Sequence, residues 1–244
     1  MNTSENGDNK HIVSSYAQEL ERLDNLILEM GGRVEAQLSA AMEAIVQRNS
    51  EKAKLVIEAD VEIDRLESQI NELTINLLAL RQPMASDLRR IVSAIKIAGD
   101  LERFGDYSKN MAKRTLVINS APAIRPVFGI ARMSERVQGM LDNVLEAHVN
   151  GDVEKAKRVW SSDEEVDDAY NSLFRELLTY MMEDPRNITV ATHLLFVAKN
   201  IERMGDLVTN IAETIHYAVS AVVLDDERPK RSTVETEEVV APAD

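Results

Sequence analysis

An eleven-residue segment of this sequence recurs at a constant offset of 100 positions. Residues 100–110 read DLERFGDYSKN and residues 200–210 read NIERMGDLVTN, with Glu, Arg, Gly, Asp and Asn at the same places. A match at one fixed offset indicates an internal repeat, in which a single structural unit is encoded twice in tandem. The chain is therefore expected to fold as two related halves, and any arrangement inferred for one half should recur in the other.

The periodicity of apolar residues indicates helices in both halves. From Val56 onward these residues alternate steps of three and four, the spacing of one helix face. Polar or proline-containing breaks divide each half into three such stretches, and aromatic residues make up only 4% of the chain. The predicted fold class is all-α, with six helices in two tandem, internally duplicated three-helix bundles. The breaks are Asn49-Ser50, Gln82-Pro83, Asn150-Gly151 and Asp184-Pro185.

The same patterns predict the domain boundaries. We expect a disordered N-terminus over residues 1–10, a first three-helix bundle over 11–120 and a second over 127–224. Residues 121–126, bracketed by prolines, form the predicted linker. The tail over 225–244 is acidic and lacks apolar periodicity, so it is predicted to be disordered.

Charge and composition exclude several classes of partner. The formal net charge of −14 at pH 7 argues against nucleic acid, because a duplex-binding surface must neutralise phosphates with basic residues. The absence of cysteine excludes disulfides and fits a reducing, cytoplasmic location. The sequence has neither a signal segment nor an apolar run long enough to cross a bilayer. We expect no direct membrane insertion, so that membrane contact would go through a partner.

Acidic residues spaced four apart project from one face of a helix. The pair Asp60/Asp64 is as far before Pro83 in the sequence as the pair Glu102/Asp106 is after it. Helices joined by a short turn are antiparallel neighbours, so the two pairs are expected at the same height.

The second half repeats this arrangement, with its two acid pairs at nearly equal sequence separations before and after Pro185. Each hairpin should therefore bring four carboxylates to the same height. An Asn side chain follows the last acid of each hairpin by four residues, so it lies on the same helix face. The predicted metal ligands are Asp60, Asp64, Glu102, Asp106 and Asn110 in the first half, and Asp163, Asp167, Glu202, Asp206 and Asn210 in the second.

Four like charges within reach of one another raise each other's pKa unless a positive charge lies between them. Oxygen ligands of this kind suit hard cations, so we expect divalent or iron-type metal ions, with Fe, Mn, Zn or Mg left open. The alternative is a solvated helix face on which Arg103 or Arg203 pairs with the acids. Gly105 and Gly205 lie within the predicted helices, where close approach of a neighbouring helix would account for them.

These motifs resemble the PhoU family, whose members carry two three-helix repeats, each with an acid-x-x-x-Asp motif followed by Asn. The resemblance covers about residues 11 to 222, and residues 82–89, QPMASDLR, are similar to the family's turn into the third helix. Two features depart from the family pattern: the second turn reads EDPRN over residues 183–187, and Asn200 replaces the acid found at Asp100.

The resemblance implies a cytoplasmic negative regulator of phosphate uptake and phosphate-starvation signalling. Its partners would be the phosphate transporter ATPase subunit and a sensor histidine kinase, and metal would bind at the acid motifs. Repeated bundles often pair symmetrically, so a homodimer is also expected.

Two other classes remain open. A di-metal carboxylate enzyme needs Glu-x-x-His on two helices, but the sequence has one such motif, Glu213 to His216, and Lys113 stands at the first-half position of its Glu. We therefore predict no enzyme and no catalytic residues. The other class is a metal-free helical adaptor whose acidic faces dock basic partners. No P-loop motif is present, and nothing in the sequence indicates direct phosphate binding.

Overall fold

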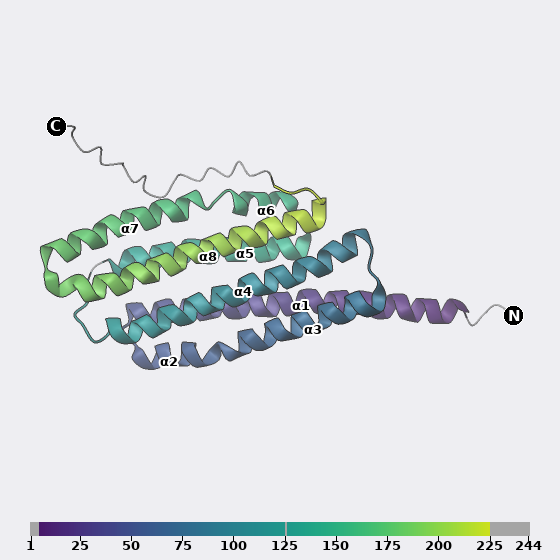
Figure 1. Ribbon diagram of the computed structural model, residues 1–244, viewed down its shortest axis with the longest axis horizontal. Helices are drawn as coiled ribbons and strands as arrows, with labels where there is room; N and C mark the ends of the chain where they lie inside the picture. Colours follow the sequence, from purple (N-terminus) through teal and green to yellow (C-terminus); the bar gives the residue numbers. More distant parts are fainter. Residues whose placement is uncertain (1–4, 125, 225–244) are drawn as a thin grey trace, which may run out of the picture.

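The computed structural model describes residues 5–124 and 126–224, with side chains from residue 15 onward, and the described residues contain helices and no strand (Figure 1). Eight α-helices and one short 3-10 turn make up this part of the chain. They are α1 (Glu5–Val46), α2 (Ser50–Ala59), α3 (Val61–Arg81), α4 (Ala85–Ile118), α5 (Val127–Asn150), α6 (Val153–Trp160), α7 (Glu164–Glu183), η1 (Pro185–Asn187) and α8 (Ile188–Ser220).

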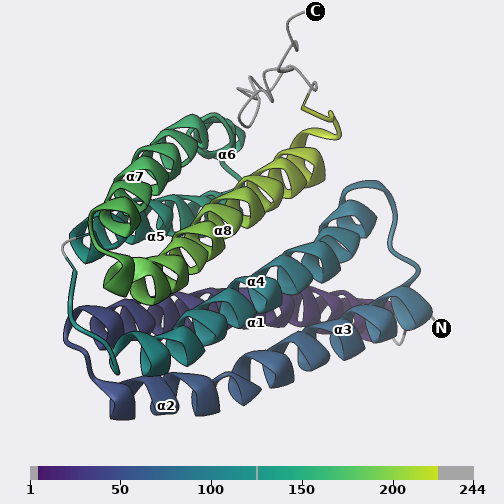
Figure 2. The same cartoon turned by 60° about the vertical axis from the view of Figure 1, so that its left-hand side comes forward.

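The helices form two three-helix bundles that lie side by side. The first contains α1, the consecutive pair α2 and α3, and α4, and the second contains α5, the pair α6 and α7, and α8. Helix α4 packs along α8 at the interface between the bundles, and α1 also contacts α5 (Figures 1 and 2). The predicted all-α fold of two tandem three-helix bundles is confirmed.

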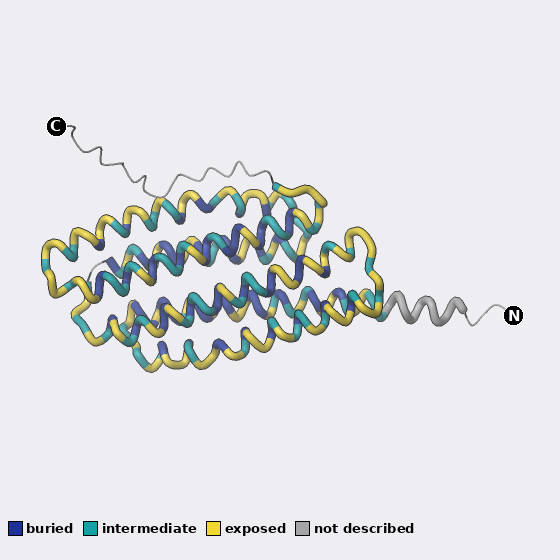
Figure 3. Tube along the Cα trace, viewed as in Figure 1, coloured by how far each residue is buried: buried dark blue, intermediate teal, exposed yellow. Residues whose placement is uncertain are grey.

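The apolar helix faces predicted from the sequence form the core of each bundle (Figure 3). Leu101 and Phe104 of α4 are fully buried, as are Ile201 and Met204 at the equivalent positions of α8. Burying a side chain of this size stabilises the fold by about 1.5–3 kcal/mol. The repeat is therefore preserved where packing requires it, with one apolar residue exchanged for another.

The second helix of each bundle is broken, although the sequence predicted it to be continuous. In the first bundle the break is one residue, Asp60, whose side chain turns inward and is buried. In the second bundle it spans residues 161–163, where the hydroxyls of Ser161 and Ser162 donate to the carbonyls of Lys157 and Val159. Side chains that bond the nearby backbone compete with the helical ladder, which is why the helix is interrupted here.

The first helix begins at Glu5, so the expectation of disorder over residues 1–10 is corrected for residues 5–10. Extending an existing helix requires only one further residue to be fixed per hydrogen bond, whereas starting one is costly. A long packed helix can therefore continue through polar residues. Residues 1–4, and the tail 225–244 for which disorder was predicted, lie outside the described part of the chain.

Equivalent caps begin the second helix of each bundle. The Asn49 side chain accepts a hydrogen bond from the backbone N–H of Lys52 at 3.0 Å, and the Asp152 side chain accepts one from Lys155 at 2.9 Å. Such caps stabilise a helix by about 1 kcal/mol. They fix the start of α2 and α6, and so they fix the height at which each helix reaches its break.

Candidate functional site

The first acid cluster lies between the junction of α2 with α3 and the middle of α4. Burial raises the pKa of Glu102, and the negative charges of Asp106, Glu67, Asp64 and Asp60 raise it further. Charges act on one another in this way only when they are near. The structure thus brings the 60–64 pair and the 102–106 pair together on one side of the hairpin, as their equal separations from Pro83 in the sequence predicted.

Asp60 is the buried member of this cluster, with 3% of its surface exposed. The ammonium Nζ of Lys109 lies 2.5 Å from Asp60 Oδ2 and 3.5 Å from Asp106 Oδ1. The amide Nε2 of Gln37 donates to Asp60 Oδ1 at 3.0 Å. The hydrogen bond to Asp60 raises the pKa of Lys109, so a lysine supplies the positive charge between two of the predicted metal ligands.

Neither Gln37 nor Lys109 was singled out in the sequence. Lys109 lies three residues after Asp106, a spacing that brings two side chains together on a helix and that could have pointed to this pairing. Gln37 comes from α1, and no local pattern connects it to the hairpin. Its position follows only from the packing of the three helices.

In the second acid cluster, the compensating positive charge comes from a lysine on the same helix as the glutamate that it pairs with. Burial raises the pKa of Glu202, Lys199 opposes this effect, and the charges of Asp206 and Asp167 add to it. Lys199 Nζ lies 2.7 Å from Glu202 Oε1, and the Glu202 side chain is 12% exposed. The other oxygen, Oε2, is buried and receives no hydrogen bond from any described residue. The carboxylate of Glu202 is therefore only half satisfied.

Both helix glycines lie opposite the break in the neighbouring helix. A Cβ at Gly105 would be 2.9 Å from Ile63 Cδ1 and 3.2 Å from Gln37 Oε1. A Cβ at Gly205 would be 3.4 Å from Val166 Cγ1 and 3.5 Å from Asp163 Oδ1, which is ordinary contact. The predicted close approach is confirmed at Gly105 and is looser at Gly205.

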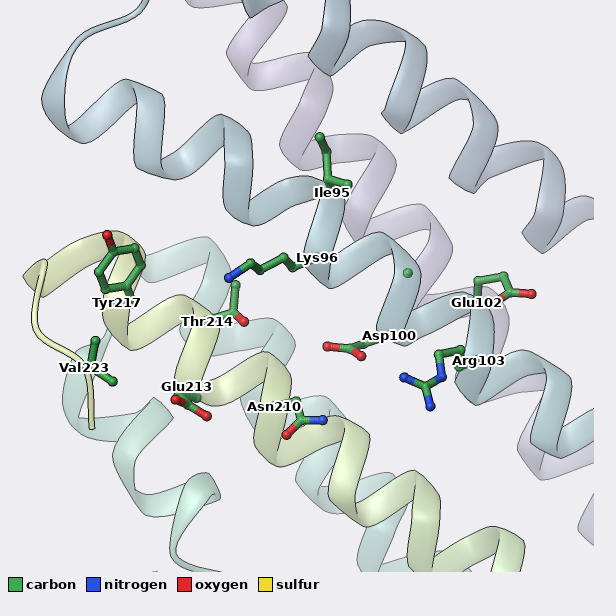
Figure 4. Close-up of a pocket in the computed structure, with 11 residues that line it drawn as sticks. Ile95, Lys96, Asp100, Glu102, Arg103, Asn210, Glu213, Thr214, Tyr217 and Val223 are labelled. Atoms are coloured by element: carbon green, nitrogen blue, oxygen red, sulfur yellow. The ribbon is translucent and has the colours of Figure 1, made fainter. Parts of the chain in front are cut away.

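The two predicted amide ligands differ from the carboxylates in their placement. Asn110 is exposed, and no hydrogen bond joins it to a described carboxylate. Asn210 lines a groove of about 830 Å³ between α4 and α8, together with Asp100 and Glu213 (Figure 4). Burial raises the pKa of Asp100 to about 6, against the opposing charges of Arg103 and Lys96. The groove lies at the interface between the two bundles, and Glu102 of the first acid cluster also lines it.

Within residues 5–124 and 126–224, no group of three or more His, Asp or Glu side chains is arranged to hold a metal ion. In the first cluster Lys109 already occupies the space between Asp60 and Asp106, which gives a physical reason. The motif of the alternative enzyme has a structural role at its His: His216 Nδ1 lies 3.0 Å from the carbonyl of Val222, next to the end of α8. Glu213 lines the groove instead (Figure 4).

No helix among the described residues is both long and apolar enough to span a membrane.

The fold and the clusters define a class of protein: an all-helical tandem repeat with one acid cluster between the second and third helices of each bundle. The sequence matches the PhoU domain over residues 27–115 and again over 130–215, one match in each bundle. This chain belongs to the PhoU family.

Relatives match over most of their length. A protein of Caulobacter vibrioides, named phosphate-specific transport system accessory protein PhoU homolog, is 49% identical over 222 residues, covering 91% of this chain and 96% of its own. The Escherichia coli accessory protein PhoU is 38% identical, covering 86% of this chain and 88% of its own. The crystal structure of PhoU from Pseudomonas aeruginosa superposes with a TM-score of 0.82 at 37% identity, covering 85% of this chain and 100% of that one.

Proposed function

We propose that this chain is an accessory regulator of the phosphate-specific transport system that restrains phosphate uptake and phosphate-starvation signalling from the cytoplasm. It would act by protein contact with the phosphate transporter ATPase subunit and with a sensor histidine kinase, and not as an enzyme. The observation that carries the proposal is the match along almost the whole length of relatives named for this transport system. An accessory role fits a molecule whose described surface is formed by two joined helical bundles.

Metal binding at the acid clusters is the second part of the proposal, and the second bundle fits it better. The Glu202 oxygen Oε2 is buried and lacks a donor among the described residues. Burial is the main cause that raises the pKa of Glu202, and the charges of Asp206 and Asp167 raise it further against the opposing effect of Lys199. A divalent cation would favour the ionised carboxylate. Asp163, Asp167, Glu202 and Asp206 are the residues that would hold it.

In the first bundle a metal would have to compete with Lys109. The ammonium contacts both Asp60 and Asp106, and a buried carboxylate that already has a cation and a Gln37 hydrogen bond gains less from another ion. We therefore propose weaker metal uptake at Asp60, Asp64, Glu102 and Asp106. Fe, Mn, Zn and Mg remain the candidate ions for both sites.

Calorimetric titration of chelator-treated protein with Mn²⁺, Fe²⁺, Zn²⁺ and Mg²⁺ tests the metal sites. Glu202→Gln with Asp206→Asn should abolish the stronger uptake, whereas the matched Glu102→Gln with Asp106→Asn should leave it in place. Equal loss in both variants would contradict the difference between the bundles. No uptake by the unmodified protein would overturn the metal proposal as a whole.

Co-purification tests the partners. A tagged copy would be expressed in Caulobacter vibrioides cells that lack their own homolog, grown with ample or limiting phosphate. We expect the transporter ATPase subunit and a sensor histidine kinase among the recovered proteins, in proportions that change with phosphate supply. Recovery of neither under both conditions would refute the regulatory contact.

A metal-free adaptor is the second candidate function, and the Lys109 pairing favours it, because the first cluster then needs no bound ion. The Glu202→Gln, Asp206→Asn variant separates the two candidates in the same co-purification. Unchanged recovery of partners supports the adaptor, and lost recovery supports a metal-dependent contact. Light scattering of the purified chain tests the proposed homodimer by its mass in solution.

A further inference from the structure

One pocket occurs twice in the molecule, once in each bundle, at a constant sequence offset of 103. In the first bundle it lies between α1 and α2, and in the second between α5 and α6, each reaching the start of the following helix. The two pockets have similar volumes of about 380 and 370 Å³. Arg33 and Lys52 line the first, and Arg136 and Lys155 occupy the equivalent positions in the second.

Three further positions have changed from apolar or small residues to hydrogen-bond donors. Each change lies in the wall of the second pocket. The Ser162 hydroxyl and the Asn143 amide donate to the carbonyls of Val159 and Gly139 at 2.7 and 2.6 Å, so Arg158 is the added donor that has no acceptor among the described residues. The changes between the first and second pockets are Ala40 to Asn143, Leu55 to Arg158 and Ala59 to Ser162.

The basic side chains of the second pocket have either no ion-pair partner among the described residues or an exposed one. Arg158 forms no ion pair with any described residue. Arg136 pairs with Glu165 at 2.5 Å and Lys155 with Glu146 at 2.5 Å, but the two glutamate side chains are 72% and 61% exposed. Exposed ion pairs contribute little to stability, so both cations can turn to a bound anion at small cost.

We propose that the second-bundle pocket binds a phosphate-type oxyanion, either free inorganic phosphate or the phosphate group of a monoester. Two guanidinium groups and one ammonium line one cavity, together with the Glu165 carboxylate that pairs with Arg136, and a tetrahedral anion has acceptor oxygens in several directions to receive hydrogen bonds from the three cations. The first pocket, with Leu55, Ala59 and Ala40 in the same places, lacks this capacity. The site requires neither the bound metal nor the partner contacts proposed above.

Titration of the full chain by calorimetry, with inorganic phosphate in one arm and glycerol phosphate in the other, tests this site. Saturable binding in either arm supports the proposal and identifies the source of the anion. Arg158→Leu restores the residue of the first pocket and should weaken binding about tenfold or more, since a charge-assisted hydrogen bond contributes about 1.5–3 kcal/mol. Because Arg158 is exposed, its loss should leave the fold intact.

Lys157→Leu is the matched control, because Lys157 is an exposed neighbour and its replacement removes the same charge from outside the pocket lining. It should leave the Kd nearly unchanged. Equal weakening by both variants would mean that general charge attracts the anion, which overturns the site. Absence of saturation in both arms overturns it as well. The triple change Ala40→Asn, Leu55→Arg and Ala59→Ser should create a second site of the same kind in the first bundle.

Discussion

The two bundles share a backbone plan and a core but neutralise their acid clusters in different ways. In the first, Lys109 of α4 reaches across to Asp60 at the junction of α2 and α3. In the second, Thr209 stands at the position of Lys109, and the compensating cation is Lys199, which pairs with Glu202 on its own helix. Duplication has preserved the positions of the acids while the source of the opposing charge has changed.

This difference has a structural counterpart at the helix breaks. The lysine of the first bundle joins two helices, and there the break is the single residue Asp60. The lysine of the second bundle pairs within one helix, and there the break extends over residues 161–163. A cross-helix ion pair holds a junction in place, whereas an i,i+3 pair stabilises only the helix that carries it.

Replacing Lys109 by Thr, the residue of the second bundle, should produce the largest effect. Asp60 would remain 3% exposed with only Gln37 as a partner, and breaking a buried pair by removing one member costs about 3–5 kcal/mol. Urea denaturation at neutral pH should show a loss of stability of this order. Adding Asp60→Asn to the variant should recover most of it, because the uncompensated charge is then gone.

Lys113→Thr provides the control, because Lys113 is an exposed residue of the same helix. Its loss should change stability by no more than about 0.5 kcal/mol. If Lys109→Thr behaves like this control, Lys109 is not the counter-ion of the first cluster, and the contrast between the bundles fails. If Lys109→Thr also gains metal uptake that Glu102→Gln removes, lysine and metal compete for one place.

A smaller difference is expected at the two helix glycines. Alanine is favoured over glycine in a helix by about 1 kcal/mol, and at Gly205 the added methyl would lie at 3.4 Å from its nearest neighbour. Gly205→Ala should therefore raise stability by roughly 0.5–1 kcal/mol. At Gly105 the methyl would meet Ile63 Cδ1 at 2.9 Å, and overpacking of about 1–3 kcal/mol should outweigh the helical gain.

Thermal unfolding of both alanine variants measures this difference as opposite shifts in Tm. Ile63→Val removes the Cδ1 atom, so it should reduce the cost of Gly105→Ala when the two changes are combined. A Gly105→Ala variant as stable as Gly205→Ala would show that the first hairpin is no tighter than the second.

Most of the fold could be predicted from the sequence repeat. The apolar spacing predicted the helices, and Leu101 and Phe104 within the repeated segment are buried. The helix breaks at Asp60 and at 161–163 were missed because they depend on short polar side chains that turn to the backbone or to the core. In the sequence the same residues look like ordinary members of an amphipathic helix.

The candidate site was predicted in part. The equal sequence separations of the 60–64 and 102–106 pairs from Pro83 predicted that the two pairs lie together, because that placement follows from helix rise and a short turn alone. Gln37 was missed because it comes from another helix. Lys109 was missed because a lysine near acids in a sequence is usually an ordinary solvated charge. The paired pockets were also missed, since a cavity is formed by the packing of three segments and leaves no local pattern. The offset of 103 is visible in the sequence between the acid pairs Asp60/Asp64 and Asp163/Asp167, but it does not show that the residues around them line a pocket.

The smallest effect concerns Asp100, for which the second half has Asn200. Burial raises the pKa of Asp100 to about 6 in the folded protein, from an ordinary value of 3.8. Between these values the folded state holds a proton that the unfolded state has released, so stability falls as pH rises through this window. Above about pH 6 the full penalty applies, and below about pH 4 it is absent.

Asp100→Asn should therefore stabilise the protein at pH 8 and have little effect at pH 4. Because the side chain is partly exposed, solvent screening reduces the gain to about 1 kcal/mol. Urea denaturation at pH 4, 6 and 8 measures the difference, and Asn200→Asp, at an equally half-buried position, should show the reverse dependence. A gain for Asp100→Asn that is the same at all three pH values would mean that the amide forms new contacts, and that the ionisation of Asp100 does not destabilise the interface between the bundles.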